Sequence, residues 1–213
     1  FYNNDELNRT AEEYITGLLN NNDVTYENEE ESIDTTHFSI IDSNGMVVSG
    51  TNTLCSFLGS KQRTNGIFLN NGGTHFGSGI NEREAGKRAR NFTAPMILTD
   101  GDYVMAIGSP GGNYIPKILV PILIDVFRNG TGLESAIQRG RIAFTYDGLL
   151  EIEENVDSQW MIDPDKVGGY SIIWSDYLNL WGAVETVGYS SDTGLFAISD
   201  HRRSGDAVIE NSR

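Results

Sequence analysis

The charge and the residue pattern of the chain change at residue 35, and this change limits what the chain can fold into. Residues 1–34 contain ten acidic residues and one basic residue, a net charge of −9. From residue 36 the pattern becomes one of β-branched and aromatic residues on both sides of an Asn44-Gly45 turn. Such a pattern predicts a hairpin with strands at residues 36–42 and 46–54. We therefore expect an acidic N-terminal segment, residues 1–34, followed by a folded domain, residues 35–213.

The rest of the folded domain alternates between strand-like and helix-like patterns. The patterns predict a strand at 66–71, a strand pair at 94–108, a buried helix at 116–130, a second helix at 132–144, and a strand, turn and strand at 180–200. Strands followed by two helices and further strands are typical of sheets layered against helices.

The N-terminal segment has a helical period of its own. Five apolar residues fall on one face of a helix: Leu7, Ala11, Tyr14, Leu18 and Leu19. The following residues, 20–32, offer little to bury and predict a mobile linker. Because the chain begins with Phe1 rather than Met, we expect that a segment precedes it.

Charge and cysteine content exclude several kinds of partner and site. The net charge of −15 and a pI near 4.4 argue against binding to nucleic acid or to an anionic membrane. Cys55 stands alone, so an internal disulfide is impossible, and no Cys/His spacing matches a zinc site. The longest apolar stretch, residues 115–127, is shorter than the roughly 18 residues of a membrane span.

Thr35 and Thr36 stand at the boundary between the two segments. A threonine hydroxyl is a poor nucleophile unless a nearby base takes its proton. The residue's own α-amino group, with a free pKa near 8, supplies such a base once the preceding peptide bond is cut. The hydroxyl itself can make that cut by attacking the preceding carbonyl. The alternative is structural, because threonine is simply common in strands.

Gly111 and Gly112 form a second candidate element. A glycine pair allows backbone N–H groups to approach a reacting oxygen, and such oxyanion donors are typically worth about 3–4 kcal/mol each. The alternative is a tight turn that leads into the helix.

In combination these motifs resemble a known family. The motifs "TTHFSIID", "TNTL", "FLNN", "APMIL", "GSPGGN" and "SDHRR" occur in this order between residues 35 and 203. They resemble the small subunit of the γ-glutamyltranspeptidases, which are N-terminal-nucleophile hydrolases, and are most similar to the branch with the poly-γ-glutamate capsule depolymerases. The resemblance implies an α/β (α+β) fold, the αββα sandwich, of which this chain is the small-subunit half.

The resemblance also implies a chemistry and its residues. The family hydrolyses or transfers γ-glutamyl groups, from glutathione-type compounds or γ-glutamyl polymers, through an acyl-enzyme and without a cofactor or metal. Cleavage between Asp34 and Thr35 would make Thr35 the nucleophile, and Thr53 would activate it. Gly111 and Gly112 would form the oxyanion hole, and Arg203 would lie near the substrate. Residues 1–34 would be the tail of the large subunit, the expected partner, in an exported protein.

Several positions depart from the family's pattern. Cys55 replaces an Asn, and His75 replaces the Asp that holds the substrate's α-ammonium group. A histidine cannot act as an anionic partner. Asn91, with Phe92, stands in place of paired serines, and Tyr114 replaces an Arg, which removes a bidentate carboxylate clamp. We retain Asn91, Tyr114 and His75 as candidate substrate-binding residues.

These departures leave two alternative functions open. The protein could be an inactive family member with a binding or structural role, or an amidase of the same fold with another acyl donor. We expect His37, two residues after Thr35, to be packed or hydrogen-bonded rather than catalytic. The cluster of Arg83, Lys87, Arg88 and Arg90 could attract an acidic polymer or be a solvated loop. With its 34–35 bond intact, the 213-residue chain itself is expected to be inactive.

Overall fold

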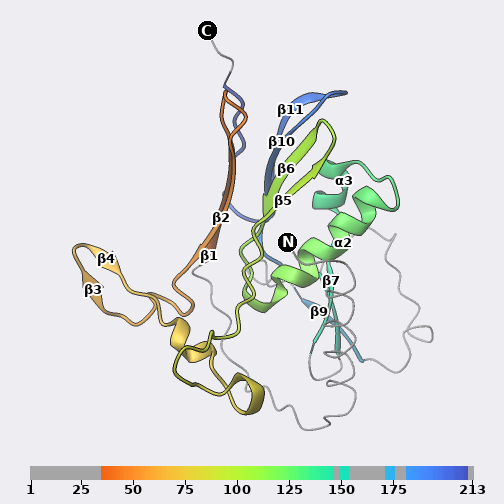
Figure 1. Cartoon of the computed structure of the whole chain (residues 1–213). Helices are drawn as coiled ribbons and strands as arrows, with labels where there is room; N and C mark the ends of the chain where they lie inside the picture. The colour runs from red at the N-terminus through yellow and green to blue at the C-terminus, as the bar shows by residue number, and fades with distance from the viewer. Residues whose placement is uncertain (1–34, 146–148, 154–170, 176–180, 211–213) are drawn as a thin grey trace.

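The computed structural model describes residues 35–145, 149–153, 171–175 and 181–210. The expected N-terminal helix and linker, and Asp34, lie outside the described residues. Figure 1 shows three layers: the β1–β2 hairpin, a larger sheet beside it, and helices α2 and α3 on the far side of that sheet. The described residues thus supply helix, sheet and sheet, which are three of the four layers of the expected αββα sandwich.

The predicted hairpin at the start of the domain is present. Strand β1 (Thr35–Ile41) pairs antiparallel with β2 (Val47–Thr53), and Thr35 lies opposite Thr53. The Asp42 carboxylate accepts hydrogen bonds from the backbone N–H groups of Asn44 and Met46, and Gly45 has a positive φ of 81°. This local turn chemistry fixes the register of the two strands, because the count from the turn decides which residues pair.

The larger sheet has four antiparallel strands in the order β11-β10-β6-β5. They are β5 (Met96–Asp100), β6 (Tyr103–Gly108), β10 (Glu185–Ser190) and β11 (Gly194–Ser199). Both strand pairs were predicted as local hairpins. Their association through β6 and β10, which are about 80 residues apart, was not predictable from local pattern, and it places the end of β6 next to the start of β10.

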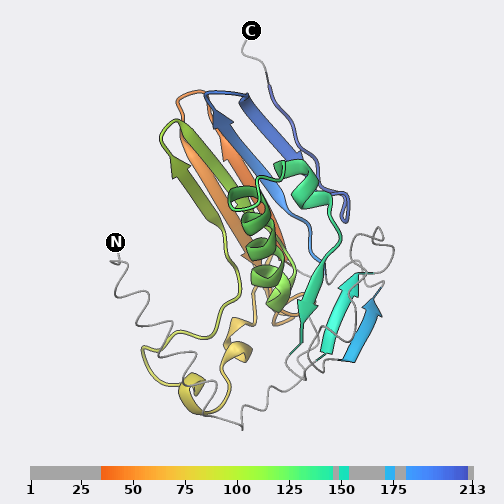
Figure 2. The same cartoon turned by 90° about the vertical axis from the view of Figure 1, so that its right-hand side faces the viewer.

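The helices cover one face of this sheet (Figure 2). Helix α2 (Ile115–Phe127) packs Ile115, Ile118, Leu119 and Ile122 into the core with Met105 and Ile107 of β6. The predicted buried helix is buried on this face only, because the opposite face of α2 exposes apolar side chains: Val120, Ile124 and Phe127 are each about half exposed.

The second predicted helix is shorter than the pattern suggested. Helix α3 (Leu133–Gln138) ends before Gly140, and β7 (Ile142–Phe144) follows it. β7 pairs antiparallel with β8 (Leu149–Glu153), which pairs parallel with β9 (Ser171–Ser175). The prediction of helix over 132–144 was therefore wrong at its end, since pairing with β8 overrides local propensity.

The loop region between β2 and β5 contains little regular structure. It includes β3 (Arg63–Thr64), β4 (Ile67–Phe68), and the 3₁₀ turns η1 (Gly72–His75) and η2 (Gly79–Asn81). The predicted strand at 66–71 is thus reduced to two residues. The basic residues at 83, 87 and 88 are exposed, and the Arg90 guanidinium lies over the Phe92 ring at 5.0 Å.

A buried network of ion pairs connects the end of β11 with the sheet formed by β7, β8 and β9. The Asp200 carboxylate, which is 1 % exposed, pairs with the guanidinium groups of Arg141 and Arg202 and accepts the Val184 N–H. Arg202 also donates two hydrogen bonds to the Glu153 carboxylate, at 2.6 and 2.7 Å. Burial alone would raise the pKa of Asp200, but the two arginines and two backbone N–H groups outweigh it and lower the pKa below 3.8. The network fixes the turn that carries Arg203.

His37 links the two strands of the hairpin on the face toward the larger sheet. Its Nδ1 is hydrogen-bonded to Thr51 Oγ1 at 2.8 Å and its Nε2 to Ser39 Oγ at 3.0 Å, and the ring lies against Gly108. Burial lowers the pKa of His37 to about 4. This environment agrees with the expectation of a packed, hydrogen-bonded histidine.

The buried His37 predicts a specific acid sensitivity. The unfolded chain binds a proton at this residue below about pH 6.5 while the folded chain resists it until about pH 4, so stability should fall as pH drops through this window. The expected loss is on the order of 2–3 kcal/mol of unfolding free energy. Urea unfolding at pH 7.5, 5.5 and 4.5 measures it.

His37→Gln should flatten this dependence, whereas His201→Gln is the matched control, because the His201 side chain is 62 % exposed. An unchanged pH slope in the His37 variant would contradict the assignment.

Candidate active site

The hydroxyl groups of Thr35 and Thr53 lie together at one end of the hairpin. Their Oγ1 atoms are 2.8 Å apart, and Thr53 Oγ1 also accepts a hydrogen bond from the Cys55 N–H at 2.9 Å. The contact follows from the register, because directly opposite residues present their side chains on the same face. With one N–H already donated to it, the Thr53 hydroxyl is suited to donate its own hydrogen to Thr35 Oγ1 as negative charge develops there.

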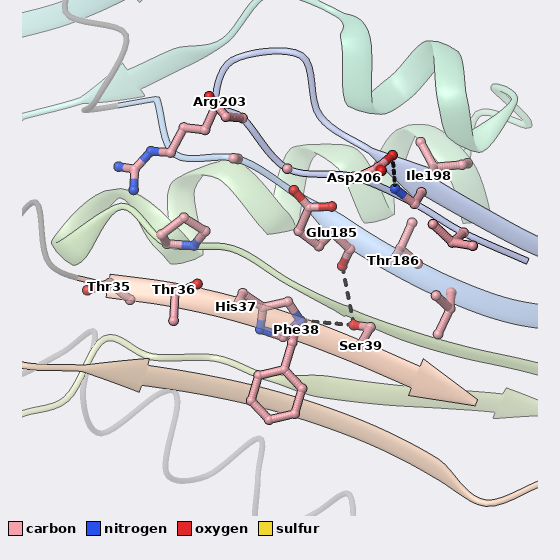
Figure 3. Close-up of a pocket in the computed structure, with 17 residues that line it drawn as sticks. Thr35, Thr36, His37, Phe38, Ser39, Glu185, Thr186, Ile198, Arg203 and Asp206 are labelled. Atoms are coloured by element: carbon pink, nitrogen blue, oxygen red, sulfur yellow. Dashed lines mark hydrogen bonds between the residues drawn. The ribbon is translucent and has the colours of Figure 1, made fainter. Parts of the chain in front are cut away.

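A cavity of about 380 Å³ extends from Thr35 between β1, β10 and the segment after β11. Figure 3 shows Thr35 at one end of β1, with Arg203 and Glu185 across from the strand. Pro110 and residues 203–208 complete part of the wall. Thr35 is only 8 % exposed, so its hydroxyl is largely shielded from bulk water.

The glycine loop begins where β6 ends, beside this cavity. Gly111 has φ 132° and ψ 18°, and Gly112 has φ 55°, conformations that side-chain-bearing residues rarely adopt. The loop is held by Ser109, whose hydroxyl donates to the Pro110 carbonyl at 2.6 Å and accepts from the Ala183 N–H at 3.1 Å. Pro110 lines the cavity, and Gly111 and Gly112 directly follow it in the sequence.

Arg203 and Glu185 line the cavity together with two further ionisable side chains, those of His37 and Asp206. Burial lowers the pKa of Arg203, although the nearby Asp200 carboxylate partly opposes the shift. Burial raises the pKa of Glu185 to about 7, against a smaller opposing effect of its hydrogen bond with Ser199. Glu185 was not singled out from the sequence. Its only sequence signal was a charged residue within a strand next to the sheet core.

The other three candidate substrate-binding residues lie elsewhere. Tyr114 is 5 % exposed, its hydroxyl donates to the Glu151 carboxylate, and its ring meets Trp181 edge to face at 5.7 Å. His75 is hydrogen-bonded through Nδ1 to the Arg90 carbonyl at 3.2 Å. The Asn91 side chain accepts hydrogen bonds from Thr93. These three residues are not among the described residues that line the cavity.

The described part of the chain offers no obvious metal centre or membrane segment. No group of three or more His, Cys, Asp or Glu side chains there could hold a metal ion. No described helix is both long and apolar enough to cross a bilayer.

Comparisons with known proteins find similar sequences and a similar solved structure. The sequence profile described as "Gamma-glutamyltranspeptidase" matches residues 4–209. The capsule biosynthesis protein CapD proenzyme of Bacillus anthracis is 47 % identical over 147 residues, which are 68 % of this chain and 27 % of that protein. The glutathione hydrolase proenzyme of Bacillus subtilis subsp. natto is 28 % identical over 202 residues, 92 % of this chain and 34 % of that protein.

A solved structure confirms the fold. The crystal structure of the Bacillus anthracis transpeptidase CapD matches with a TM-score of 0.66 and 33 % identity, covering 83 % of this chain and 99 % of the compared chain. The N-terminal-nucleophile type of α+β fold expected from the sequence is therefore correct. The chain spans about a quarter to a third of the length of the curated relatives named above.

Proposed function

The chain belongs to the γ-glutamyltranspeptidase family, and on that premise we propose that it is the small-subunit part of a proenzyme that hydrolyses or transfers γ-glutamyl groups. The observation that carries the proposal is the 2.8 Å contact between the Thr35 and Thr53 hydroxyl groups at the end of a cavity that Arg203 also lines. The relatives named as proenzymes support a precursor that is cut, with a large subunit as the partner.

Maturation begins with an attack of Thr35 Oγ1 on the carbonyl carbon of residue 34. The acyl group moves from nitrogen to oxygen, the Thr35 nitrogen gains a proton as its bond to that carbon breaks, and water hydrolyses the resulting ester. The product is a free α-amino group on Thr35. The hydrogen bond with Thr53 keeps the Thr35 hydroxyl in place on β1, both for this cleavage and for the later attack on the donor.

Turnover then uses the freed amine as the base. The amine takes the proton from Oγ1 as the oxygen attacks the γ-carbonyl of the donor, and it returns a proton to the leaving amine. Thr35 is left as a γ-glutamyl ester, which water or an acceptor amine resolves. The Gly111 and Gly112 N–H groups are the proposed donors to the oxyanion, and Arg203 the proposed partner of a donor carboxylate.

The ester intermediate gives a direct test. The precursor is allowed to mature, mixed with a γ-glutamyl anilide and quenched in acid, and its intact mass is measured. The expected result is a small subunit that begins at Thr35 and has gained the mass of one γ-glutamyl group, located by peptide mapping on its first peptide. Maturation without any acylated Thr35, together with no release of aniline, would instead support an inactive family member.

The donor class is tested by comparing glutathione, poly-γ-glutamate and a simple N-acyl amide. The 47 % identity to the capsule protein favours a γ-glutamyl polymer among the proposed donors. The 30 % identity over 191 residues to a Pseudomonas acylase, acylase ACY 1 proenzyme, favours including the N-acyl amide. An extracellular or cell-envelope location is part of the proposal and rests on the family resemblance alone.

A further inference from the structure

A basic loop region follows the hairpin of Thr35 and Thr53 in a chain that is otherwise acidic. Residues 54–95 contain six basic and two acidic residues, a net charge of +4, whereas the whole chain has a net charge of −15. The proposed mechanism uses none of these basic residues. Five of the six basic side chains are exposed: Lys61, Arg63, Arg83, Lys87 and Arg88. A local excess of positive charge on an acidic protein concentrates anions at that place and not elsewhere.

A turn, which we call the basic turn, gathers three of these residues: Arg83, Lys87 and Arg88. The Lys87 N–H donates to the Glu84 carbonyl at 3.2 Å, and Gly86, the third residue of the turn, has a φ of 78°. A type II turn requires a positive φ at this position, and glycine adopts it without strain. Since a β-turn brings its first and last residues within about 7 Å of each other, the three cationic residues share one exposed tip of the loop region.

The cationic groups of the basic turn are not neutralised within the described part of the chain. Arg83, Lys87 and Arg88 form no ion pair with a described Asp or Glu side chain. Arg90 differs from them, because its guanidinium lies over the Phe92 ring. One exposed cation gains little energy from one anion, so a ligand is held at such a surface only if it presents several anionic groups together. The basic turn is therefore suited to a polyanion rather than to a single carboxylate.

His75 holds the two ends of the segment that carries the basic turn. Its Nδ1 is hydrogen-bonded to the Arg90 carbonyl at 3.2 Å, and its own carbonyl accepts a hydrogen bond from Asn81 Nδ2 at 2.6 Å. The 3₁₀ turn η1, which contains His75, follows Asn71, and the Asn71 N–H donates at 3.2 Å to the carbonyl of the residue after Thr53. His75, which does not line the cavity, therefore connects the basic turn with the end of β2.

The cavity and the loop region lie on different sides of Thr35. The cavity is lined by residues 35–39 and extends along β1, between this strand and β10. Figure 1 shows the loop region, with η1 and η2, beyond the end of the hairpin at which β1 begins and β2 ends. No described residue of the loop region lines the cavity. A chain molecule bound across Thr35 thus has one part in the cavity and a further part over the loop region.

We propose that the basic turn binds carboxylates of an anionic γ-glutamyl polymer whose reacting unit lies in the cavity. This proposal rests on the proposed γ-glutamyl transfer at Thr35, and it selects the long polymer among the proposed donors because each of its units has a carboxylate. A short donor such as a γ-glutamyl anilide occupies the cavity alone. Duplex nucleic acid is a different polyanion, and the net charge of −15 opposes its approach.

The test compares matured wild-type protein with the triple variant Arg83→Gln, Lys87→Gln and Arg88→Gln on two donors, a long γ-glutamyl polymer and a γ-glutamyl anilide. In low salt the variant should raise KM for the polymer about 10-fold, because each exposed ion pair contributes a factor of about 2. KM for the anilide, and kcat for both donors, should change less than about twofold. Arg128→Gln is the matched control, because it removes an exposed cation at the end of α2, beyond the larger sheet.

Salt dependence supplies a readout that a merely structural role would not move. In the wild-type protein, KM for the polymer should rise with ionic strength, since salt screens attraction between exposed charges. If repulsion by the acidic remainder of the chain dominated, KM would instead fall. The triple variant should lose most of the rise, and the double variant Arg83→Lys and Arg88→Lys, which keeps the charge, should retain it. A polymer KM that does not rise with salt in the wild-type protein would refute the proposal.

The outcomes separate this proposal from the one it rests on. If the triple variant acylates Thr35 and uses the polymer as wild type does, the role of the basic turn is refuted and the proposed function stands. If wild type forms no Thr35 ester with either donor, the proposed function falls. Anisotropy of a labelled γ-glutamyl polymer then decides the binding site by itself, and equal affinity for wild type and triple variant refutes it.

Two further outcomes are decisive. If duplex DNA binds more tightly than the γ-glutamyl polymer and the triple variant abolishes that binding, the basic turn is a nucleic-acid site and the proposal is wrong. If the triple variant does not mature, the single variant Arg83→Gln replaces it. This variant should raise KM for the polymer about twofold and reduce its salt dependence, and an unchanged KM and salt dependence would refute the proposal.

Discussion

Replacing Thr35 with alanine in the full precursor is expected to abolish both cleavage between residues 34 and 35 and γ-glutamyl turnover. In the proposed mechanism both steps use the same hydroxyl, so its removal stops both. The expected loss in kcat is at least about 10³-fold, as for removal of other enzyme nucleophiles. Intact mass reports the cleavage, and anilide release reports the turnover.

Two further variants make this result specific. Thr35→Ser keeps a hydroxyl and should retain slower cleavage and measurable turnover. Thr99→Ala removes an exposed threonine from the edge strand β5 and should change neither. Normal turnover by Thr35→Ala, or by wild-type protein in which the 34–35 bond remains intact, would overturn the mechanism.

Of the substitutions proposed in this article, Asp200→Asn is expected to lower the free energy of unfolding the most. The substitution removes the carboxylate that pairs with the buried guanidinium of Arg141, and it leaves that of Arg202 paired with Glu153 alone among the described carboxylates. Breaking a buried ion pair by removal of one partner typically costs about 3–5 kcal/mol, since the remaining charge stays buried. Denaturant unfolding of the matured protein at pH 7 measures the loss.

The pH dependence of this loss follows from the lowered pKa of Asp200. The stabilisation is present above the ordinary value of 3.8 and disappears only as pH falls through the lower folded-state pKa. The variant and wild type should therefore converge only in strong acid. Asp102→Asn, in the exposed turn between β5 and β6, is the control. A loss at pH 7 no larger than that of the control would contradict a stabilising role for the network.

The same network explains why the adjacent residues Arg202 and Arg203 have different surroundings. Arg202 turns inward to Glu153 and Asp200 and is 7 % exposed, whereas Arg203 lines the cavity. The motif "DHRR" pointed to Arg203 through family resemblance. Local pattern could not separate the two, because the buried partners of Arg202 include Glu153 on β8 and the carbonyls of Ile137 and Arg139, all distant in sequence.

Some features of the site follow from local sequence. The Asp42–Gly45 turn and the alternating residues around it set the hairpin register, and that register alone brings Thr35 opposite Thr53. The glycines at 111 and 112 similarly predict a backbone conformation that needs no distant partner. The contacts of Tyr114 were not predictable in this way. The family resemblance suggested Tyr114 as a substrate-binding residue, whereas its phenol is buried against Glu151 and Trp181.

The sequence by itself determined the hairpin, its paired threonines, the glycine turn and the family, since each depends on residues close together or on motifs in a fixed order. The tertiary structure decided that Glu185 and Arg203 share a cavity with Thr35 while His75, Asn91 and Tyr114 do not line it. The physical reason is the pairing of β10 with β6 and β11. Strands from distant parts of the chain meet there through side-chain packing and backbone hydrogen bonds, and no local pattern specifies which strands will be neighbours.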